Sequence, residues 1–339
     1  MLTAAVIGVG SMGRNHARVY SKLDEARLVG VSDLIHTTAQ EVGALYGVPA
    51  YQDYREMLAE VRPTVVSITV PTANHVEIGI AAMHAGAHVL IEKPIADTLE
   101  GGYRLIHAAQ SFERQLMVGH IVRYNPAVQL LKEKLSKGEL GRIFQITCRR
   151  VGPFPARIRD VGVVVDLATH DLDVMRYLTA MEPTRVFAET EHRINTEQED
   201  LMLALLRFPG GITGSLEVNW LTPNKVREIL VLGEHGLFRV DDLAQDLFFY
   251  ENADQSGVLW HPRESIKGVS EGAMTRYALK RREPLQAELH AFLAAIRTGK
   301  PVPVSGEDGI AALRLALALV ESGKRNQVIW MTNEPARAA

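Results

Sequence analysis

Three residues in two short segments of the sequence could carry out chemistry together. Lys93 stands in the segment IEKP, residues 91–94, and Asp166 and His170 stand four residues apart in the run VVDLATHDLDVMRYL, residues 164–178. An ammonium group near a reacting oxygen stabilises a developing alkoxide or polarises a carbonyl. An imidazole can accept a proton near neutral pH, and a nearby carboxylate can orient it. These groups would suit hydride transfer from an alcohol, because the hydroxyl proton must leave as the hydride leaves carbon.

Each of these residues also has a structural interpretation. Lys93 could be an exposed lysine paired with Glu92, since most lysines lie at protein surfaces. The helix would carry one polar stripe, which could be the solvated face of an amphipathic helix. This stripe consists of Asp166, His170, Asp173 and Tyr177. Asp166 and His170 could also bind a metal, but no third ligand follows at a suitable spacing, so we predict no metal site.

The segment GVGSMG, residues 8–13, has the spacing of a phosphate-binding loop between a strand and a helix. Gly8 permits a tight turn, Gly10 lets a pyrophosphate approach the backbone, and Gly13 lets helix and strand pack closely. The alternative is that these glycines only form a turn. The strand and helix around them favour a dinucleotide site.

Two further features support this site. The helix that starts near Ser11 and Met12 would offer N–H groups and partial positive charge to phosphates. Asp33 follows Gly13 by 20 residues, where a carboxylate can accept hydrogen bonds from ribose hydroxyls and would repel a 2′-phosphate. Asp33 could instead merely cap the next helix. We predict NAD as the cofactor, in preference to NADP.

The elements that would position these residues alternate along the first third of the chain. The expected strands are Ala5–Val9, Leu28–Ser32, Thr64–Thr69, Ala87–Ile91 and Gln115–Val118. The expected helices are Met12–Tyr20, Thr37–Tyr46, Tyr54–Glu60, Asn74–His84 and Thr98–Ala109. Apolar strands separated by helices indicate a parallel sheet covered on both faces. We expect an α/β fold that starts with a Rossmann dinucleotide-binding domain, residues 1–120.

Beyond residue 120, mostly consecutive strands follow two helices. The clearest hairpin joins residues 200–208 and 212–220 through Pro209-Gly210-Gly211, and Gly233-Glu234-His235-Gly236 is typical of another turn. We expect residues 121–339 to form an α+β domain with a large, mainly antiparallel open-faced sheet. Residues 251–283 show little periodicity, and no element is predicted there.

The segment from Arg149 to Arg159 concentrates positive charge in an acidic protein. Arg149, Arg150, Arg157 and Arg159 surround two prolines just before the helix that carries Asp166. Such a segment would suit phosphate or carboxylate groups of a substrate. It could equally be a solvated run of charge.

Composition excludes several classes of protein. The chain has 339 residues, enough for two domains, and a formal charge of −3 without the basic stripes of a nucleic-acid binder, so we expect no nucleic-acid partner. No apolar stretch approaches the length of a membrane span, and we expect no membrane partner. The single cysteine, Cys148, is typical of a buried apolar residue in a reducing compartment. We therefore expect an unprocessed cytoplasmic protein.

The combination of these motifs resembles the glucose-fructose oxidoreductase/inositol dehydrogenase (Gfo/Idh/MocA) family. The resemblance covers nearly the whole chain and includes PTANH at 71–75, AGAHVLIEKP at 85–94 and GKPVPVSGEDG at 299–309. It implies an NAD(P)-dependent dehydrogenase acting on CH–OH groups, which transfers a hydride between nicotinamide and a ring carbon of a sugar. It also implies an open sheet face that builds homodimers or homotetramers.

The resemblance further implies roles for individual residues. His170 would be the general acid/base, Lys93 would stabilise the reacting oxygen, and Asp166 would orient substrate and histidine. The implied cofactor site consists of Gly8, Gly10, Ser11, Met12, Gly13, Asp33, Thr69, Pro71, His75, Glu92 and Lys93. The implied substrate site consists of Lys93, Arg123, Asn125, Arg157, Arg159, Asp166 and His170.

Residues 119–126 and 150–171 are similar to nucleotide-sugar dehydrogenases, especially those that oxidise UDP-N-acetylglucosamine at C3. This is the function we expect. A free-sugar or inositol dehydrogenase is one alternative, although a neutral polyol has no use for four arginines. A non-catalytic dinucleotide-binding sensor is another alternative, although a sensor does not need Lys93, Asp166 and His170.

Overall fold

The computed structural model describes residues 1–154, 161–194, 197–253 and 271–331. The chain forms two compact units: the first comprises residues 1–124 and 282–317, and the second comprises residues 125–281 and 318–339. The first unit therefore includes a segment that follows most of the second unit in the sequence. The expected division into functional domains at residue 120 stays a prediction.

Six parallel strands form the sheet of the first unit, in the order β3-β2-β1-β4-β5-β6. Their bounds are β1 (Leu2–Ile7), β2 (Ala26–Ser32), β3 (Ala50–Tyr51), β4 (Val65–Ile68), β5 (His88–Glu92) and β6 (Leu116–Gly119). Strand side chains such as Ala5, Val66 and Leu90 are fully buried, as expected for a parallel sheet with both faces covered. The predicted doubly wound α/β domain is confirmed.

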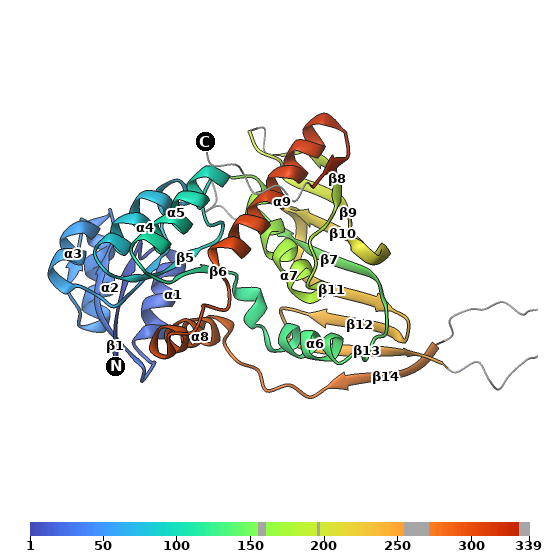
Figure 1. Ribbon diagram of the computed structural model, residues 1–339, viewed down its shortest axis with the longest axis horizontal. Coiled ribbons are helices and arrows are strands. Elements are labelled where there is room, and N and C mark those ends of the chain that lie inside the picture. Colours follow the sequence, from blue (N-terminus) through green and yellow to red (C-terminus); the bar gives the residue numbers. More distant parts are fainter. Residues whose placement is uncertain (155–160, 195–196, 254–270, 332–339) are drawn as a thin grey trace, which may run out of the picture. The chain divides into compact units, whose positions relative to one another are not determined.

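Helices flank this sheet on both sides. They are α1 (Ser11–Tyr20), α2 (His36–Tyr46), α3 (Tyr54–Val61), α4 (His75–His84), α5 (Leu99–Ser111) and α8 (Pro284–Thr298), with short 3₁₀ turns η1 (Thr72–Asn74) and η2 (Ile121–Tyr124). α1 packs against α2 and α8, and α4 packs against α5. In Figure 1, α4 and α5 lie on one side of the sheet, and α1 and α8 lie on the other. The long helix α9 (Gly306–Arg325) begins in this unit and ends in the second.

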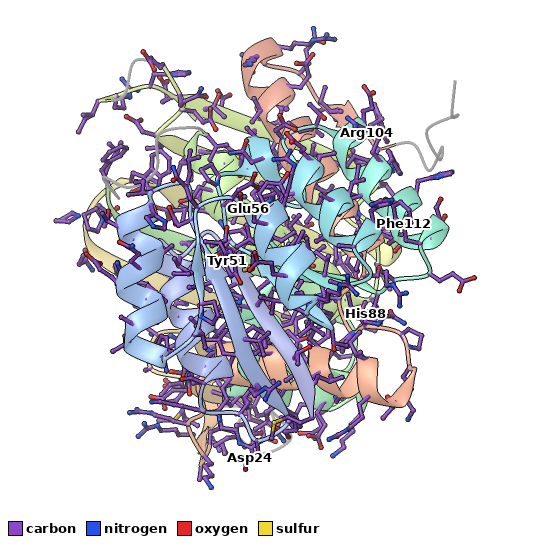
Figure 2. All side chains as sticks on the ribbon, turned by 90° about the vertical axis from the view of Figure 1, so that its left-hand side faces the viewer. Asp24, Tyr51, Glu56, His88, Arg104 and Phe112 are labelled. Carbon is purple, nitrogen blue, oxygen red and sulfur yellow. The ribbon has the colours of Figure 1, made fainter. Side chains whose placement is uncertain are left out.

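The carboxyl ends of the parallel strands share one edge of the sheet. In Figure 2, Asp24, just before β2, and His88, at the start of β5, lie lower than Tyr51, which ends β3. Ligands of open α/β sheets bind at the carboxyl edge. β1 ends at Ile7, two residues earlier than predicted, because Gly8 has a φ of 85° and starts the turn toward α1.

Nine strands form the sheet of the second unit, in the order β14-β13-β12-β11-β7-β10-β9-β8-β15. Their bounds are β7 (Ile143–Pro153), β8 (Arg185–Glu191), β9 (Leu201–Arg207), β10 (Thr213–Asn219), β11 (Leu221–Gly233), β12 (Gly236–Asp241), β13 (Asp246–Asn252), β14 (Glu271–Tyr277) and β15 (Ile329–Trp330). Only β7 and β10, among the described neighbours, run parallel. The predicted mainly antiparallel sheet is confirmed. β14 was not predicted, because its side chains are almost all exposed and show no alternation.

Both predicted hairpins are present in this sheet. The 3₁₀ turn η4 (Pro209–Gly211) joins β9 to β10, and Glu234 with His235 joins β11 to β12. Along β9, Met202 is buried whereas Leu203 and Leu205 are about half exposed, so one face of the sheet is covered and the other is open.

Besides the end of α9 and the turn η4, the second unit contains α6 (Pro126–Ser136), the π-helical segment η3 (Val164–Ala168) and α7 (Thr169–Thr179). α7 packs on β7, and α6 packs on β12 and β13. Cys148 of β7 is buried, as predicted. In the described part of the chain, no helix combines the length and apolar composition needed to cross a lipid bilayer.

Candidate functional site

The glycine loop of the first unit has little room for side chains, except at Gly10. A Cβ on Gly13 would lie 1.9 Å from the carbonyl oxygen of Gly8, and a Cβ on Gly8 would lie 2.7 Å from Val70 Cγ1. A Cβ on Gly10 would meet no atom within 4 Å. Gly8 and Gly13 therefore permit close packing within the protein, whereas Gly10 leaves space for a ligand.

The N-terminus of α1 faces this space without a side-chain cap. Gly10 occupies the cap position, and the first turn, which starts with exposed Ser11 and partly buried Met12, holds no acidic residue. The first amide groups of a helix lack partners within the helix and carry partial positive charge. The segment therefore suits an anion such as a pyrophosphate.

Asp33 is fixed at the end of β2 by backbone hydrogen bonds. Its Oδ2 accepts from the N–H of Val9 at 2.8 Å, and its Oδ1 accepts from the N–H of Ile35 at 2.9 Å. The next side chain, Leu34, is 84% exposed and apolar. A carboxylate held in this way can accept from ribose hydroxyls and opposes the charge of a 2′-phosphate.

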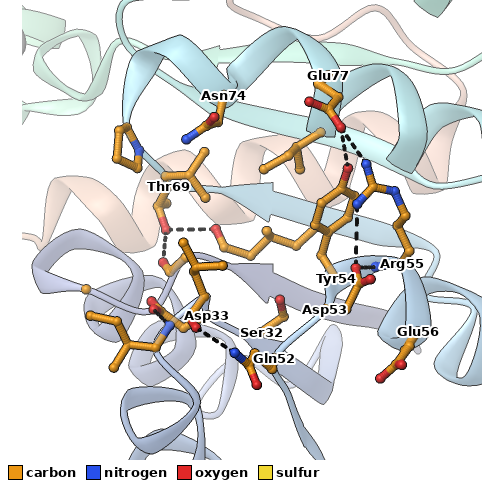
Figure 3. A pocket seen from close by; sticks show the side chains of 18 residues that line it. Ser32, Asp33, Gln52, Asp53, Tyr54, Arg55, Glu56, Thr69, Asn74 and Glu77 are labelled. Atoms are coloured by element: carbon orange, nitrogen blue, oxygen red, sulfur yellow. Dashed lines mark hydrogen bonds and ion pairs between the residues drawn. The ribbon is translucent and has the colours of Figure 1, made fainter.

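A cavity of about 770 Å³ lies at the carboxyl edge of the sheet, a size within the range of small-molecule sites. Five predicted cofactor residues line it: Gly8, Gly10, Asp33, Thr69 and Pro71. Figure 3 shows Tyr54 and Arg55 directed at Glu77 on the cavity wall. Arg55 forms ion pairs with Glu77 and, at 3.8 Å, with Asp53, so its charge is already balanced within the protein.

Thr69 and a further predicted residue, His75, connect segments that follow the strand ends. Thr69 Oγ1 donates to the Gly8 carbonyl and supports the glycine loop. His75, which is buried, places Nδ1 2.9 Å from the Pro94 carbonyl oxygen and Nε2 3.0 Å from that of Val70. Burial lowers the pKa of His75, and the carbonyl contacts only partly oppose this effect.

Glu92 ends β5, Lys93 follows it, and a buried histidine contacts Glu92. His16 of α1 is fully buried, and its Nε2 lies 3.0 Å from Glu92 Oε1. Burial raises the pKa of the Glu92 carboxyl, but the hydrogen bond and charge of His16, and then the charge of Lys93, outweigh burial and leave this pKa lowered. Sequence reasoning missed His16, because nothing local connects it to a residue 76 positions away. Lys93 is partly buried.

Asp166 and His170 lie on consecutive elements of the second unit. Asp166 belongs to η3 and His170 to α7, and π-helical turns occur frequently at functional sites. Asp166 is 6% exposed, and no described residue of 161–179 is exposed, so the alternative of a solvated helix face is wrong. Within the described ranges, no three His, Cys, Asp or Glu side chains gather as a metal site requires.

Glu199 fixes the start of this helical segment and was missed by sequence reasoning. Its carbonyl accepts from the N–H of Val163 at 2.9 Å, and its Oε1 accepts from the N–H of Val164 at 3.2 Å. A Cβ on Gly162 would lie 2.1 Å from the Glu199 carboxylate, so the residue before the segment must be small. Glu199 precedes a strand, and no capping pattern in the sequence signals this contact.

The predicted arginine segment is not one structural unit. Arg149 and Arg150 lie in β7, where Arg149 pairs with Glu217 at 2.8 Å and Arg150 binds both oxygens of Asp171 at 2.8 and 2.9 Å. The interpretation of Arg150 as a solvated residue is wrong, because its side chain is buried and paired with Asp171 of α7, and a substrate contact for Arg150 stays a prediction. Arg157 and Arg159 lie outside the described residues, and their role in substrate binding stays a prediction.

Arg123 and Asn125, also predicted to bind substrate, contact other residues of their own units. Arg123 is paired with Asp308 at 3.0 Å. Asn125 donates to the side chain and backbone of Asp242 at 2.6 and 2.9 Å and accepts from the N–H of Ala127, which caps α6. A substrate contact for either residue stays a prediction.

The matches to known families and proteins span both units. Residues 2–120 match the oxidoreductase family with an NAD-binding Rossmann fold, and residues 128–239 match the GFO/IDH/MocA C-terminal domain. The UDP-N-acetylglucosamine 3-dehydrogenase of Acidithiobacillus ferrooxidans is 33% identical over 93% of this chain and 95% of that protein. The myo-inositol 2-dehydrogenase of Thermotoga maritima is 28% identical over 94% of this chain and 95% of that protein.

Solved structures show the same relationship. A structure of the Acidithiobacillus ferrooxidans enzyme has a TM-score of 0.83 at 32% identity and covers 96% of this chain and 98% of that chain. A levoglucosan dehydrogenase at 24% identity shares the fold, with a TM-score of 0.84 over 97% of this chain and 99% of that chain. The predicted NAD cofactor is confirmed by the family match of the first unit, whose glycine loop and Asp33 fit it. The chain is a member of the Gfo/Idh/MocA family of NAD-binding oxidoreductases.

Proposed function

We propose that this protein is an NAD-dependent dehydrogenase that oxidises a ring hydroxyl of a nucleotide sugar, with UDP-N-acetylglucosamine at C3 as the first candidate. The observation that carries this proposal is the 33% identity to a UDP-N-acetylglucosamine 3-dehydrogenase over 93% of the chain. The similarity extends over both units, so it includes the second unit, which sets substrate choice in our proposal.

The first unit would hold the cofactor through groups that are already in place. The open position at Gly10 and the uncapped α1 N-terminus would receive the pyrophosphate, and Asp33 would bind the adenosine ribose. When bound, NAD accepts the hydride. The paired state of Arg55 leaves no cation ready for a 2′-phosphate at this wall of the cavity, which favours NAD over NADP.

The proposed chemistry of the protein residues concerns the hydroxyl proton. His170 removes this proton, Lys93 stabilises the developing negative charge on the oxygen, and Asp166 orients His170 and the substrate. Glu199 and Gly162 support this assignment, because they set where the helical segment with Asp166 begins.

A free-sugar or inositol dehydrogenase is the second candidate function. The observation in its favour is the 28% identity to a myo-inositol 2-dehydrogenase over 94% of the chain. A neutral polyol has no use for four arginines, which counts against this candidate. Arg149 and Arg150 count less against it, however, because they bind carboxylates of their own unit.

We also propose that the open sheet face of the second unit binds another copy of the chain, as a dimer or tetramer. On this face Leu203 and Leu205 of β9 are each more than half exposed, and so is Met274 at the far strand β14, which leaves apolar side chains for a second copy to cover. Leu203→Glu with Leu205→Glu should shift the particle mass measured by light scattering to a smaller species. An unchanged mass would place the contact elsewhere.

The proposed function is tested by following NAD reduction through the absorbance of the reduced nicotinamide. UDP-N-acetylglucosamine, UDP-glucose, N-acetylglucosamine and myo-inositol are compared with NAD and with NADP. Activity confined to the UDP-sugars supports the proposal, activity on free polyols supports the second candidate, and no activity on any of them favours a non-catalytic sensor. His170→Ala should lose about 10²-fold or more in turnover while still binding NAD.

A further inference from the structure

Arg227 of β11 is an arginine that the sequence did not single out. It lies directly opposite Arg150 in the antiparallel pairing of β11 with β7. Its Nη1 donates to the carbonyl oxygens of Val151 at 2.6 Å and Val226 at 2.8 Å. One nitrogen therefore holds the guanidinium against the backbone, and the side chain is partly buried.

The opposite edge of this guanidinium forms no hydrogen bond or ion pair with the residues that the structure describes. Within the described part of the chain, Nε and Nη2 of Arg227 form neither a hydrogen bond nor an ion pair. These two N–H groups point in parallel, which is the arrangement that binds two oxygens of a phosphate or carboxylate. Arg227 is thus held in place with its two-pronged donor edge available.

The carboxylates near Arg227 do not fully neutralise the positive charge of its guanidinium. Asp171 and Asp242 both bind Arg150, at 2.8 and 3.5 Å. Burial and then the charge of Arg150 lower the pKa of Arg227, and the carboxylates of Asp171, Asp242 and Asp166 offset this only in part. A partly buried cation in this situation gains from an anionic ligand.

Arg227 lies on the sheet face that carries α7. Residues 225, 227 and 229 alternate with 226 and 228, and Ile229 is buried on the same face as Arg150, which binds Asp171 of α7. Gly152 lets the side chains of Lys225 and Arg227 pass close to the backbone there. A Cβ on Gly152 would lie 3.2 Å from Lys225 Cγ and 3.9 Å from Arg227 Nη1. Two cationic side chains therefore lie over one glycine, in the unit that carries Asp166.

We propose that Arg227, assisted by Lys225, binds phosphate oxygens of the substrate and so selects nucleotide sugars over free sugars. This inference rests on the proposed function, since it names the residues that would recognise the diphosphate of the substrate. In this proposal Arg227, and not Arg150, is the cation that binds the diphosphate, because Asp171 already neutralises Arg150.

The test compares Arg227→Gln and Arg227→Lys with Arg142→Gln. Arg142 belongs to the same unit, but its side chain is 78% exposed and paired with Glu234. Arg227→Gln should raise KM for UDP-N-acetylglucosamine about tenfold to hundredfold, the loss expected for hydrogen bonds to a charged group. Its affinity for uridine, measured by calorimetry, should change less than about threefold, because uridine has no phosphate.

The matched variants separate charge from geometry. Arg227→Lys should regain only part of the affinity, because lysine restores the charge without the two-pronged donor edge. Arg142→Gln should leave both the KM for the UDP-sugar and the affinity for uridine unaffected. Equal losses for the UDP-sugar and for uridine in Arg227→Gln, or an unchanged KM for the UDP-sugar, would overturn the inference.

A direct binding measurement keeps the inference distinct from the proposed function. Calorimetry with UDP and with uridine measures the phosphate contribution without turnover, and NAD binding by each variant serves as the control for folding. If the wild type oxidises no UDP-sugar but binds UDP more tightly than uridine, and Arg227→Gln loses that difference, the inference stands and the proposed function fails. If the wild type binds UDP no better than uridine, the inference itself is overturned.

Discussion

Replacing Asp171 by alanine would leave a buried arginine without its main partner. Asp171 is 1% exposed and Arg150 is 7% exposed in their side chains, and the carboxylate binds Nε and Nη2 of the guanidinium at 2.8 and 2.9 Å. In the variant, Asp242 at 3.5 Å is the remaining carboxylate recorded beside Arg150 in the described chain. Arg150 also stays opposite Arg227 in the strand pairing, so two cations would share that carboxylate.

The expected loss follows from this geometry. Removing one partner of a buried ion pair costs about 3–5 kcal/mol. Asp242 moderates the loss and Arg227 increases it, so we expect about 4 kcal/mol, a large share of the roughly 5–15 kcal/mol that stabilises a typical domain. Burial lowers the pKa of Arg150, but the carboxylates of Asp171 and Asp242 outweigh burial and hold this pKa above its ordinary value, so the guanidinium is charged in the wild type.

Urea unfolding followed by tryptophan fluorescence measures this loss, because Trp220 is buried in the second unit. The comparison is the double variant Arg150→Met with Asp171→Leu, which removes both charges and fills similar volume. It should recover more than half of the lost free energy, because apolar replacement of a buried pair is often neutral. A loss below about 1 kcal/mol for Asp171→Ala, or a double variant as unstable as the single one, would refute the reasoning.

Three further predictions concern the first unit. Gly10→Ala should change the unfolding free energy by less than about 0.5 kcal/mol yet weaken NAD binding about tenfold or more, whereas Gly13→Ala should lose stability by about 1–3 kcal/mol because its Cβ would lie 1.9 Å from Gly8 O. Calorimetry and urea unfolding of both variants check this, and equal behaviour would contradict it. His16→Leu should be less stable than His16→Gln by about 1–3 kcal/mol, because only the amide can still donate to Glu92; equal midpoints would remove this hydrogen bond from the account. His75 has a pKa lowered from 6.5 by burial, so its contribution to stability is present above pH 6.5 and is lost as the pH falls below that value through the lowered pKa. As the pH falls below 6.5, the unfolding free energy should therefore decrease less steeply in His75→Gln than in the wild type. Parallel profiles would assign the pH dependence to other groups.

Much of the first unit was predictable because its signals are local. Apolar strands alternate with helices, and the glycine loop requires a positive φ at residue 8 and close approach at residue 13, which are properties of single positions. Asp33 was found from its distance along the chain to that loop. The two hairpins of the second unit were found for the same reason, since glycine turns lie between adjacent strands.

The sequence by itself therefore determined the main candidate functional groups of this protein. They are a glycine loop, a carboxylate at the end of the next strand, and the three candidates Lys93, Asp166 and His170. Only the tertiary structure decided which charged side chains are paired within the protein and which keep donor groups available for a ligand. Arg150 binds Asp171 and leaves Arg227 with an available edge, and His16 binds Glu92 from 76 positions away. These pairings depend on strand register and helix packing, which bring distant residues together without leaving a local pattern in the sequence.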